Sequence, residues 1–568
     1  MTDPGMKGVK MELILIVDAM STGENFIMDI VQRDFRPAVI WSWHNEAIFA
    51  ALSESRKGVE LVYDGLADFY TEDPDYEKTL SMVKELSPKL ILPGSDMGVE
   101  LATRLADDLG LLGNPYSRID NYTNKNIMHR MLLEHGVRGV RGKVVHNWEE
   151  TIGYYREEGF EGCVLKPYRG ASSINVRICE NEEQLKEAFD EVWATGNYMG
   201  GSEEGMLLEE RITGTEYIVN TVSYKGKHKL SALWRHSKKS VQGGGMVYNY
   251  TESLKYLEAG CSSLVKYAFS VLDVLGVEYG NVHSEIMIDE KGPVLIEVNC
   301  RPMGSHMDAD FLDRIWGHHE TDLCLDAFLH PERFLEHIHD PFRPLAKGVK
   351  KHLITPREED ISSASILSLY KWQKSISKAR LEKSISGHLK RTVDLSTASG
   401  VLYLVSEDIG QLYRDLMFWE RAENRYFDML FSDLRISADQ MPKDLMSIKE
   451  VIEGIKPVGA VLLLSNKIIH FPESVTVDMG SIAGVKRHFQ YGVLDLNYEE
   501  NEDYEMMSDA FFALAGKIRK DGYLYVPKRT YWHFPCGLES VEMLCEVAGL
   551  EIQAPNIDSG ELLIARKI

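Results

Sequence analysis

The alternation of apolar and polar positions predicts strands and helices in turn at the N-terminal end of the chain. Residues 13–17 form an unbroken apolar run, Leu-Ile-Leu-Ile-Val, which is typical of a parallel strand buried on both faces. A helical pattern follows as far as Gln32, and further strands are predicted at 38–41 and 89–93. Strands that alternate with helices indicate an open α/β unit, which we place at residues 1–115.

A turn of small residues, Ser21-Thr22-Gly23, follows the first of these strands. A dinucleotide-binding loop at this position has the spacing G-x-G-x-x-G, and the sequence lacks it. We therefore expect this turn to be structural or to face a substrate.

Residues 283–301 show the pattern of a β-hairpin with a short turn that contains glycine. Side chains alternate between the two faces of a strand, so one face of this hairpin collects six residues: His283, Glu285, Met287, Leu295, Glu297 and Asn299. If residues 290–292 form the turn, Glu285 lies directly opposite Glu297. The other face is apolar, which indicates a sheet packed on one side rather than a fully solvated hairpin.

Two carboxylates directly opposite each other repel. A hard dication between them removes the repulsion, and carboxylate oxygens suit Mg²⁺ that is held together with phosphates. Arg301 follows Asn299 by two residues and is therefore placed to meet an anion. The hairpin predicts a nucleotide–magnesium centre.

A second group of candidate residues lies upstream. Residues 163–167 form a short apolar strand that contains Lys166, and a loop of small residues that includes Ser172 follows. Such a loop can bring backbone N–H groups close to phosphates, with the lysine as a point charge, although an ordinary hairpin turn is the alternative. A strand, a polar crossover and another strand are predicted across residues 206–219.

The order of these features resembles the ATP-grasp superfamily. The resemblance rests on a lysine before a helix (Lys125), a strand lysine (Lys166), the small-residue loop, the 206–219 segment and the acid–acid–x–Asn–x–Arg signature that ends at Arg301. It implies an ATP-grasp core at residues 116–340.

The same resemblance implies roles for individual residues. Those that would bind the nucleotide are Lys125, Lys166, Ser172, Glu209, Glu210 and Glu216. Among them, the lysines would hold the phosphates, the backbone near Glu209 and Glu210 would read adenine, and Glu216 would hold the ribose. The residues that would bind two Mg²⁺ ions, with Mn²⁺ as an alternative, are Glu285, Glu297 and Asn299. Arg301 would contact the acyl phosphate or the substrate carboxylate.

A basic segment is followed by three consecutive glycines, Gly243 to Gly245. Glycines in series suit a mobile loop that closes over substrate, and a solvated connector is the alternative. Arg235, His236 and Lys238 are candidates for neutralising an acyl phosphate. Lys238 is therefore grouped with Arg301 and Glu297 as a catalytic candidate, and His283 is expected to neighbour the site and to orient a ligand glutamate.

Beyond the core, the resemblance implies a small C-terminal lobe at residues 341–436, as in amino-acid ligases and biotin carboxylases. Residues 437–568 resemble, weakly, the back half of a class I methyltransferase, without a recognisable glycine-rich methyl-donor loop. We expect a cofactor-free α/β remnant used for dimerisation or partner binding, and an active methyltransferase is the alternative.

Composition limits the function classes. The chain of 568 residues has a net charge of −24, which argues against nucleic acid or an anionic membrane as the main partner. Its seven cysteines are scattered without a C-x-x-C pair, which favours a reduced compartment. No apolar run approaches membrane-spanning length. We expect a cytoplasmic protein with small-molecule substrates, and a homodimer by default.

Residues 280–301 look closest to the L-amino-acid ligase group, with Cys300 where proline is frequent. The leading hypothesis is an ATP-dependent carboxylate–amine ligase that acts on amino-acid-like substrates through an acyl phosphate and releases ADP and phosphate. A biotin-carboxylase-like enzyme that uses bicarbonate would share the core, although the chain has no Met-Lys-Met carrier motif. A non-catalytic nucleotide-binding regulatory protein is a third hypothesis. Residues 304–308 and 235–250 are expected to contribute to specificity.

Overall fold

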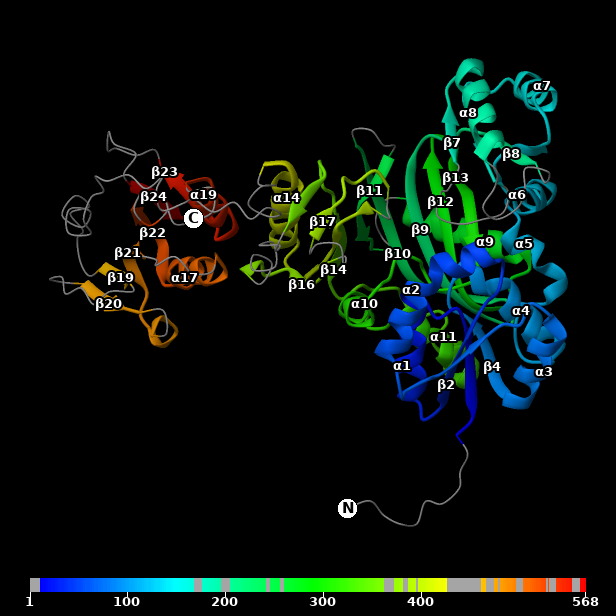
Figure 1. The fold of residues 1–568 in the computed structure, drawn as a ribbon, viewed down its shortest axis with the longest axis horizontal. Coiled ribbons are helices and arrows are strands. Elements are labelled where there is room, and N and C mark those ends of the chain that lie inside the picture. Colours follow the sequence, from blue (N-terminus) through cyan, green and yellow to red (C-terminus); the bar gives the residue numbers. More distant parts are fainter. Residues whose placement is uncertain are drawn as a thin grey trace, which may run out of the picture. The chain divides into compact units, whose positions relative to one another are not determined.

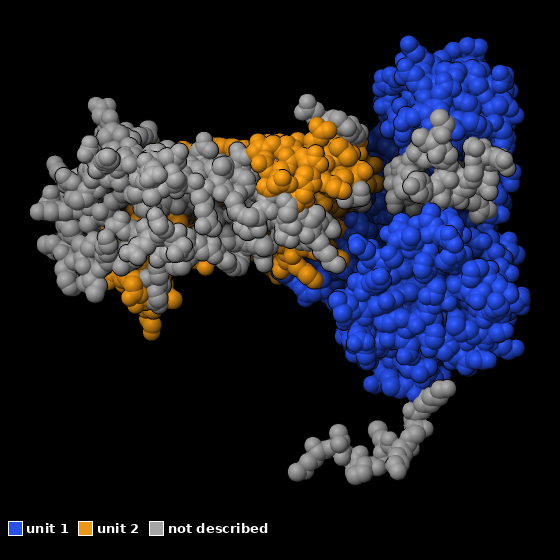
Figure 2. Space-filling model, in the orientation of Figure 1, with its two compact units in different colours: residues 1–236, 252–346 blue, residues 237–251, 347–568 orange. Residues whose placement is uncertain are grey.

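The computed structural model describes most of the chain, in the following ranges: 11–167, 176–195, 205–241, 246–255, 260–361, 372–381, 387–394, 397–425, 461–465, 474–478, 481–496, 504–527, 530, 538–553 and 562–568. The chain divides into two compact units (Figure 2). The first unit comprises residues 1–236 and 252–346, and the second comprises residues 237–251 and 347–568. The finer division into four domains stays a prediction.

The N-terminal part of the first unit is a four-stranded parallel sheet in the order β3-β2-β1-β4. Its strands are β1 (Leu13–Val17), β2 (Arg36–Trp41), β3 (Asp68–Thr71) and β4 (Pro88–Pro93). The three strands expected from the sequence are confirmed, and β3 was missed. It is an edge strand in which Asp68 and Thr71 are exposed, so it lacks the apolar run that marks the others.

Helices cover both faces of this sheet because successive side chains of a strand point to opposite faces. Ile14 and Ile16 pack with α1 (Asn25–Val31), whereas Leu13, Leu15 and Val17 pack with α4 (Val99–Asp108). Two more helices, α2 (Glu46–Val62) and α3 (Tyr76–Leu86), complete this α/β part (Figure 1).

An antiparallel sheet forms the centre of the first unit, with β13 (Gly292–Asn299), β12 (Tyr279–Asp289), β9 (Thr215–Tyr224) and β10 (Lys227–Ser240) in this order. Helix α9 (Cys261–Leu275) packs on the face that carries Val219, Ile286 and Val298. The opposite face packs Val222 and Tyr224 with α11 (Glu320–Leu329) and α1. The N-terminal part and the central sheet therefore share one core.

A second antiparallel sheet in the first unit has the order β5-β8-β6-β7. Its strands are β5 (Gly142–Val145), β6 (Cys163–Lys166), β7 (Arg177–Cys179) and β8 (Met206–Glu210). One face packs on α7 (Trp148–Glu158) and α8 (Glu182–Thr195), through Leu208 of β8 among others. The strands predicted around Lys166 and Glu209 are confirmed.

Two predicted helices are confirmed together with the residues that bound them. Helix α6 (Lys125–Glu134) begins after Asn124, whose side chain accepts a hydrogen bond from the backbone of Ile127 at 3.2 Å. Helix α9 ends at Gly276, which has a φ of 72° and so occupies the left-handed region that favours glycine. Lys125 is therefore fixed at the first turn of a capped helix.

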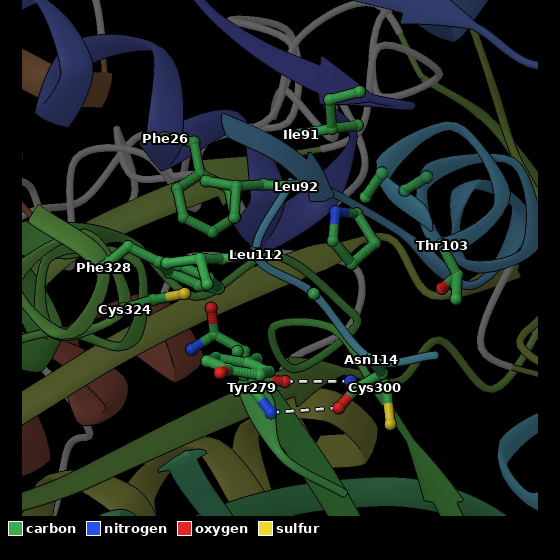
Figure 3. Close-up of a pocket in the computed structure, with 16 residues that line it drawn as sticks. Phe26, Ile91, Leu92, Thr103, Leu112, Asn114, Tyr279, Cys300, Cys324 and Phe328 are labelled. Atoms are coloured by element: carbon green, nitrogen blue, oxygen red, sulfur yellow. Dashed lines mark hydrogen bonds between the residues drawn. The ribbon is translucent and has the colours of Figure 1, made fainter. Parts of the chain in front are cut away.

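Asn114 joins the N-terminal part to strand β12 beside a small apolar pocket (Figure 3). Its amide donates to the carbonyl of Tyr279 at 2.9 Å and accepts from the backbone N–H groups of Glu278 and Tyr279 at 2.8 and 2.9 Å. Phe26 and Phe328 line the same pocket. These contacts fix the start of β12, the strand that carries Glu285.

The second unit contains two antiparallel strand pairs, β14–β18 and β18–β16, from β14 (Lys347–Leu353), β16 (Ile376–Leu381) and β18 (Gly400–Ser406). Strand β11 (Met246–Ser253) neighbours β14, and β15 (Glu359–Ile361) pairs with β17 (Gly387–Leu389). Helix α14 (Ile409–Arg425) places Glu423 beside Lys351, with 2.5 Å between the ammonium and the carboxylate. Both side chains are buried, so this ion pair ties the helix to β14.

A six-stranded sheet follows in the second unit, in the order β20-β19-β21-β22-β24-β23. Its elements are β19 (Val461–Ser465), β20 (Ser474–Val477), β21 (Phe489–Asp495), α17 (Tyr504–Gly516), β22 (Ile518–Pro527), α19 (Leu538–Val547), β23 (Leu550–Gln553) and β24 (Leu562–Lys567). The first four strands are parallel, and β24 is antiparallel to both of its neighbours. Within the described part of the chain, no helix is long and apolar enough to span a membrane.

The ion pairs of the buried His319 should make the stability of the first unit depend on pH. Burial opposes its charged form, but Asp29 at 2.9 Å and Asp313 at 2.8 Å raise the pKa of the ring to about 10. A group whose pKa is higher in the folded than in the unfolded state stabilises the folded protein. Its contribution is complete when the pH lies below the pKa of the unfolded state, and it is lost as the pH rises through the pKa of the folded state.

We expect His319→Gln to lower the free energy of unfolding by about 2 kcal/mol at pH 6, because a buried charge pair loses one partner. The difference from the wild type should shrink between pH 7 and pH 10. Melting curves across this range measure it, with the exposed His337→Gln as the control. A deficit that stays constant with pH would contradict the ionic role.

Candidate active site

The hairpin of β12 and β13 places Glu285 directly opposite Glu297, as expected. The expected turn was wrong, because Asp289 pairs with Gly292 and only two residues connect the strands. A β-bulge at Ile296 adds one residue to β13, so the expected pairing of Glu285 with Glu297 is restored on the far side of the bulge from the turn. Leu295 consequently faces the α9 core and not the acids, since the bulge reverses the alternation of side chains.

Glu297 is the most connected residue of the hairpin. Its carboxylate lies 2.8 Å from the ammonium of Lys125 and accepts a hydrogen bond from the Asn299 amide at 2.9 Å. Burial opposes ionisation of Glu297, but Lys125, Asn299 and the charge of Lys166 hold its pKa well below the usual range. Glu297 is therefore an anion at neutral pH, and both predicted phosphate-binding lysines act on it.

Arg301 meets an acid that the sequence analysis missed. Its guanidinium binds Asp96 through two hydrogen bonds of 2.6 and 2.7 Å and is only 6% exposed. Burial opposes the charge of Arg301, while Asp96, Glu297 and Glu285 raise its pKa. Asp96 follows β4 at the carboxyl end of the parallel sheet, where open α/β folds place their ligands, and this rule was the available signal.

His283 connects Glu285 to the interior of the protein. Its Nδ1 lies 2.9 Å from Oδ1 of Asn220, and its Nε2 lies 3.3 Å from a carboxylate oxygen of Glu285. Burial and the nearby charge of Arg301 lower the pKa of the ring to about 3, although nearby acids oppose this shift. His283 is therefore neutral and neighbours the predicted metal ligand, as expected.

Lys166 and Glu209 form a buried ion pair at 2.6 Å, with His129 of α6 at 3.5 Å from the other carboxylate oxygen. Burial is the main cause that lowers the pKa of His129, to about 4, so the ring is neutral. From the sequence, only the backbone of Glu209 was expected to take part in the site. A cleft lined by His129, Val140, Leu207 and Glu209 lies between α6 and the β5–β8 strands.

The other predicted nucleotide residues occupy different surroundings. Glu210 forms a salt bridge with Arg141 at 2.9 Å. Glu216 is nearly buried on β9, with one carboxylate oxygen 3.9 Å from the ring of His236, and its charge reaches His283. Ser172 lies outside the described residues.

The basic segment that precedes the glycines is part of a strand, because residues 234–240 continue strand β10. Trp234 is fully buried and packs on Phe311 and Trp316, and this apolar contact holds the segment extended. Arg235 donates to the buried acid Glu252 at 2.9 Å.

Lys238 belongs to the second unit, where its ammonium lies 4.6 Å from the ring centre of Tyr248. Its catalytic role stays a prediction. The three glycines, Gly243 to Gly245, lie outside the described residues.

The Ser21-Thr22-Gly23 turn holds the loop that follows Arg301. The hydroxyls of Ser21 and Thr22 accept hydrogen bonds from the backbone N–H groups of His306 and Met307 at 2.6 and 2.8 Å. Ser21 and His306 have positive φ values of 60° and 28°, which non-glycine residues adopt at a cost of roughly 1–3 kcal/mol. The turn is therefore structural, and it shapes the 304–308 loop that we predict to contribute to specificity.

The site thus gathers two lysines, an arginine, two opposed carboxylates and an amide in the first unit. This donor set fits Mg²⁺, because the ligands are oxygens and Glu297 is held ionised beside cations that can also meet phosphates. In the described residues, no three His, Cys, Asp or Glu side chains cluster as a metal site. The arrangement can bind a nucleotide polyphosphate and neutralise charge at a transferring phosphoryl group.

Comparisons with known proteins agree with this geometry. A family profile described as "ATP-grasp domain" matches residues 160–310. Dapdiamide A synthase from Enterobacter agglomerans is 30% identical over 336 residues, which cover 57% of this chain and 75% of that protein. The chain belongs to the ATP-grasp family. It is an enzyme of the carboxylate–amine ligase type, which forms C–N bonds, and this family uses ATP and Mg²⁺.

A further curated relative and a solved structure are similar over a smaller share or at lower identity. D-alanine–D-alanine ligase from Lacticaseibacillus casei (strain BL23) is 29% identical over 148 residues, which cover 24% of this chain and 38% of that protein. The crystal structure of L-amino acid ligase from Bacillus licheniformis superposes with a TM-score of 0.56 at 15% identity, covering 73% of this chain and 98% of that chain. At this identity, the structural likeness shows the ATP-grasp fold.

The Asp96–Arg301 pair gives a testable prediction. Replacing Asp96 by Asn removes the carboxylate that binds the buried guanidinium of Arg301, so we expect a loss on the order of 3 kcal/mol in the free energy of unfolding. Added inorganic phosphate should raise the melting temperature of Asp96→Asn more than that of the wild type, because an anion replaces the carboxylate. Asp108→Asn, at the exposed end of α4, is the matched control. Equal melting temperatures without phosphate would contradict the prediction.

Proposed function

We propose that this enzyme activates a substrate carboxylate as an acyl phosphate and couples it to the amino group of an amino-acid-like second substrate. The products are an amide or a peptide bond, ADP and phosphate. The names of dapdiamide A synthase and D-alanine–D-alanine ligase support the proposal, because ATP-grasp relatives with those names share the core.

The single observation that carries the proposal is the opposition of Glu285 and Glu297, with Lys125 bound to Glu297 and Arg301 close to both acids. Two acids and an amide provide oxygen ligands for a dication, and the cations are placed to meet phosphate oxygens. A purely structural ion-pair cluster would not need two carboxylates in direct cross-strand opposition.

The proposed reaction has two steps. An oxygen of the substrate carboxylate attacks the γ-phosphorus of ATP, the bond to the β–γ bridging oxygen breaks, and ADP leaves. The amine nitrogen then attacks the acyl carbon, the bond from this carbon to the phosphate oxygen breaks, and phosphate leaves while the nitrogen loses a proton. The enzyme mainly aligns the reactants and neutralises charge.

Each residue of the site has a place in this scheme. Lys125 and Lys166 hold the phosphates, and Arg301 neutralises the transferring group while Asp96 keeps its guanidinium in position. Glu285, Glu297 and Asn299 hold two Mg²⁺ ions, or Mn²⁺ in their place, which when bound neutralise phosphate charge and polarise the phosphoryl group. The cleft beside Glu209 offers apolar walls for the base, and Glu216 is the candidate for the ribose.

We also propose that residues 437–568 are a methyltransferase-like remnant that serves dimerisation or partner binding. The strand order supports this, because β24 lies antiparallel between β22 and β23, as in the back half of class I methyltransferases. The segment after β19, where such enzymes hold the methyl donor, contains no glycine between 466 and 473. A cytoplasmic location is proposed from the scattered cysteines, since none of the six in the described residues forms a disulfide.

The first experiment measures ADP and phosphate release across a matrix of amino acids. We expect release that requires both an acid and an amine partner, and a fall of about 10²-fold or more in Glu297→Gln, because a metal ligand and the partner of Lys125 are lost. Glu290→Gln, in the exposed turn of the same hairpin, is the matched control and should retain full activity.

Two outcomes would overturn the proposed reaction. Release that depends on bicarbonate and biotin would indicate a carboxylase. Tight binding of Mg-ATP without release from any pair of amino acids would indicate a regulatory nucleotide site.

A further inference from the structure

A chain of buried hydrogen bonds leads from helix α11 to the predicted metal ligand Glu285. Glu320, the first residue of α11, accepts hydrogen bonds from the amide nitrogen of Asn220 and from the backbone N–H of Met303 at 2.9 Å. The amide oxygen of Asn220 faces Nδ1 of His283 at 2.9 Å, and Nε2 of His283 faces Glu285 at 3.3 Å. Asn220, His283 and Glu320 are each no more than 4% exposed.

The direction of these bonds fixes the tautomer of His283. The backbone N–H of Met303 can only donate, and Asn220 turns its NH₂ group to Glu320, so Glu320 acts as an acceptor on both sides. The amide oxygen of Asn220 must then accept from His283, which places the ring proton on Nδ1. A ring that carries a single proton, on Nδ1, has its lone pair on Nε2.

This lone pair faces a carboxylate oxygen of Glu285, so two hydrogen-bond acceptors stand 3.3 Å apart. Two acceptors cannot form a hydrogen bond with each other, but both can bind one donor or one cation that lies between them. Glu285 stands opposite Glu297 at the proposed metal site, where Mg²⁺ would keep several of its waters. A water of that hydration shell is the donor that matches both acceptors.

We propose that Glu320, acting through Asn220, holds His283 as a hydrogen-bond acceptor that positions the hydration shell of the metal beside Glu285. Glu320, Asn220 and His283 are positioning residues in this scheme, which rests on the proposed nucleotide–magnesium site. Such outer-shell partners of a metal typically change its affinity by 10–100-fold when they are replaced.

The substitution Glu320→Gln tests the direction of these hydrogen bonds, because Gln has nearly the same shape as Glu. The backbone N–H of Met303 keeps the carbonyl oxygen of the new amide, so its NH₂ group faces Asn220. Asn220 must then turn its oxygen to residue 320 and its NH₂ group to His283, which moves the ring proton to Nε2. The ring now donates to Glu285 and competes with the hydrated metal.

The affinity for Mn²⁺ in the presence of ADP is the main measurement, read from the free Mn²⁺ signal in electron paramagnetic resonance. We expect about a tenfold loss of affinity in Glu320→Gln and in His283→Ala. Asn281→Ala is the matched control. The buried side-chain amide of Asn281 donates to the backbone carbonyl of Glu320 at 2.9 Å, so its removal leaves the hydrogen bonds from Glu320 to His283 intact. Its affinity should stay within about twofold of the wild type.

Nitrogen NMR of ¹⁵N-histidine-labelled protein gives a second, structural readout. The wild type should show His283 protonated at Nδ1, and Glu320→Gln should show it protonated at Nε2, with the His283→Ala spectrum used for assignment. Protonation of Nε2 in the wild type would overturn the inference. An equal loss of Mn²⁺ affinity in Glu320→Gln and Asn281→Ala would also overturn it, because docking of α11 would then explain both.

The test separates this inference from the proposed function. If the wild type binds Mn²⁺–ADP and Glu320→Gln binds it equally well, the positioning role fails and the nucleotide site stands. If the wild type binds no Mn²⁺–ADP, the nucleotide–metal site itself fails, and the inference that rests on it is overturned as well.

Discussion

Two carboxylates, Glu285 and Glu297, face each other across neighbouring strands, and the surrounding charges are arranged around their repulsion. Lys125 binds Glu297, the charge of Lys166 acts on it, and Arg301 lies within electrostatic reach of both acids. In an isolated antiparallel sheet such a pair would be destabilising. It persists here because capped helix α6, strand β6 and the segment after β13 each bring one cation to the same place.

The N-terminal α/β part completes the site instead of standing apart from it. Asp96 extends from the carboxyl end of β4 to Arg301, and the turn after β1 binds the 304–308 loop. The shared core with β9 and α11 and the contacts of Asn114 hold these parts together. A ligand at this edge therefore meets both a parallel sheet and an antiparallel one, which suits an enzyme that aligns two substrates with a nucleotide.

Much of the fold was readable from local patterns, and the failures have specific physical causes. Continuous apolar runs gave β1 and β6, and Gly276 marked the end of α9. The edge strand β3 was missed because half of it is exposed. The extended conformation of residues 234–240 was not predicted, because the aromatic residues that pack on Trp234 are distant in the sequence. The turn of the hairpin was misplaced, yet Glu285 still met Glu297 because a bulge at Ile296 added one residue to the register.

The sequence by itself determined the chemical inventory: the two acids, the amide, the arginine and the two lysines, each at a position where strand alternation or a helix start places it on a predictable face. Only the tertiary structure decided their partners. Asp96 and Arg301 are 205 residues apart, and Asn220 and Glu320 are 100 apart. Local patterns report which face a side chain occupies, because a strand or helix repeats within a few residues. Which charge or hydrogen bond meets it depends on how distant elements pack, and this is where the electrostatics of the site are set.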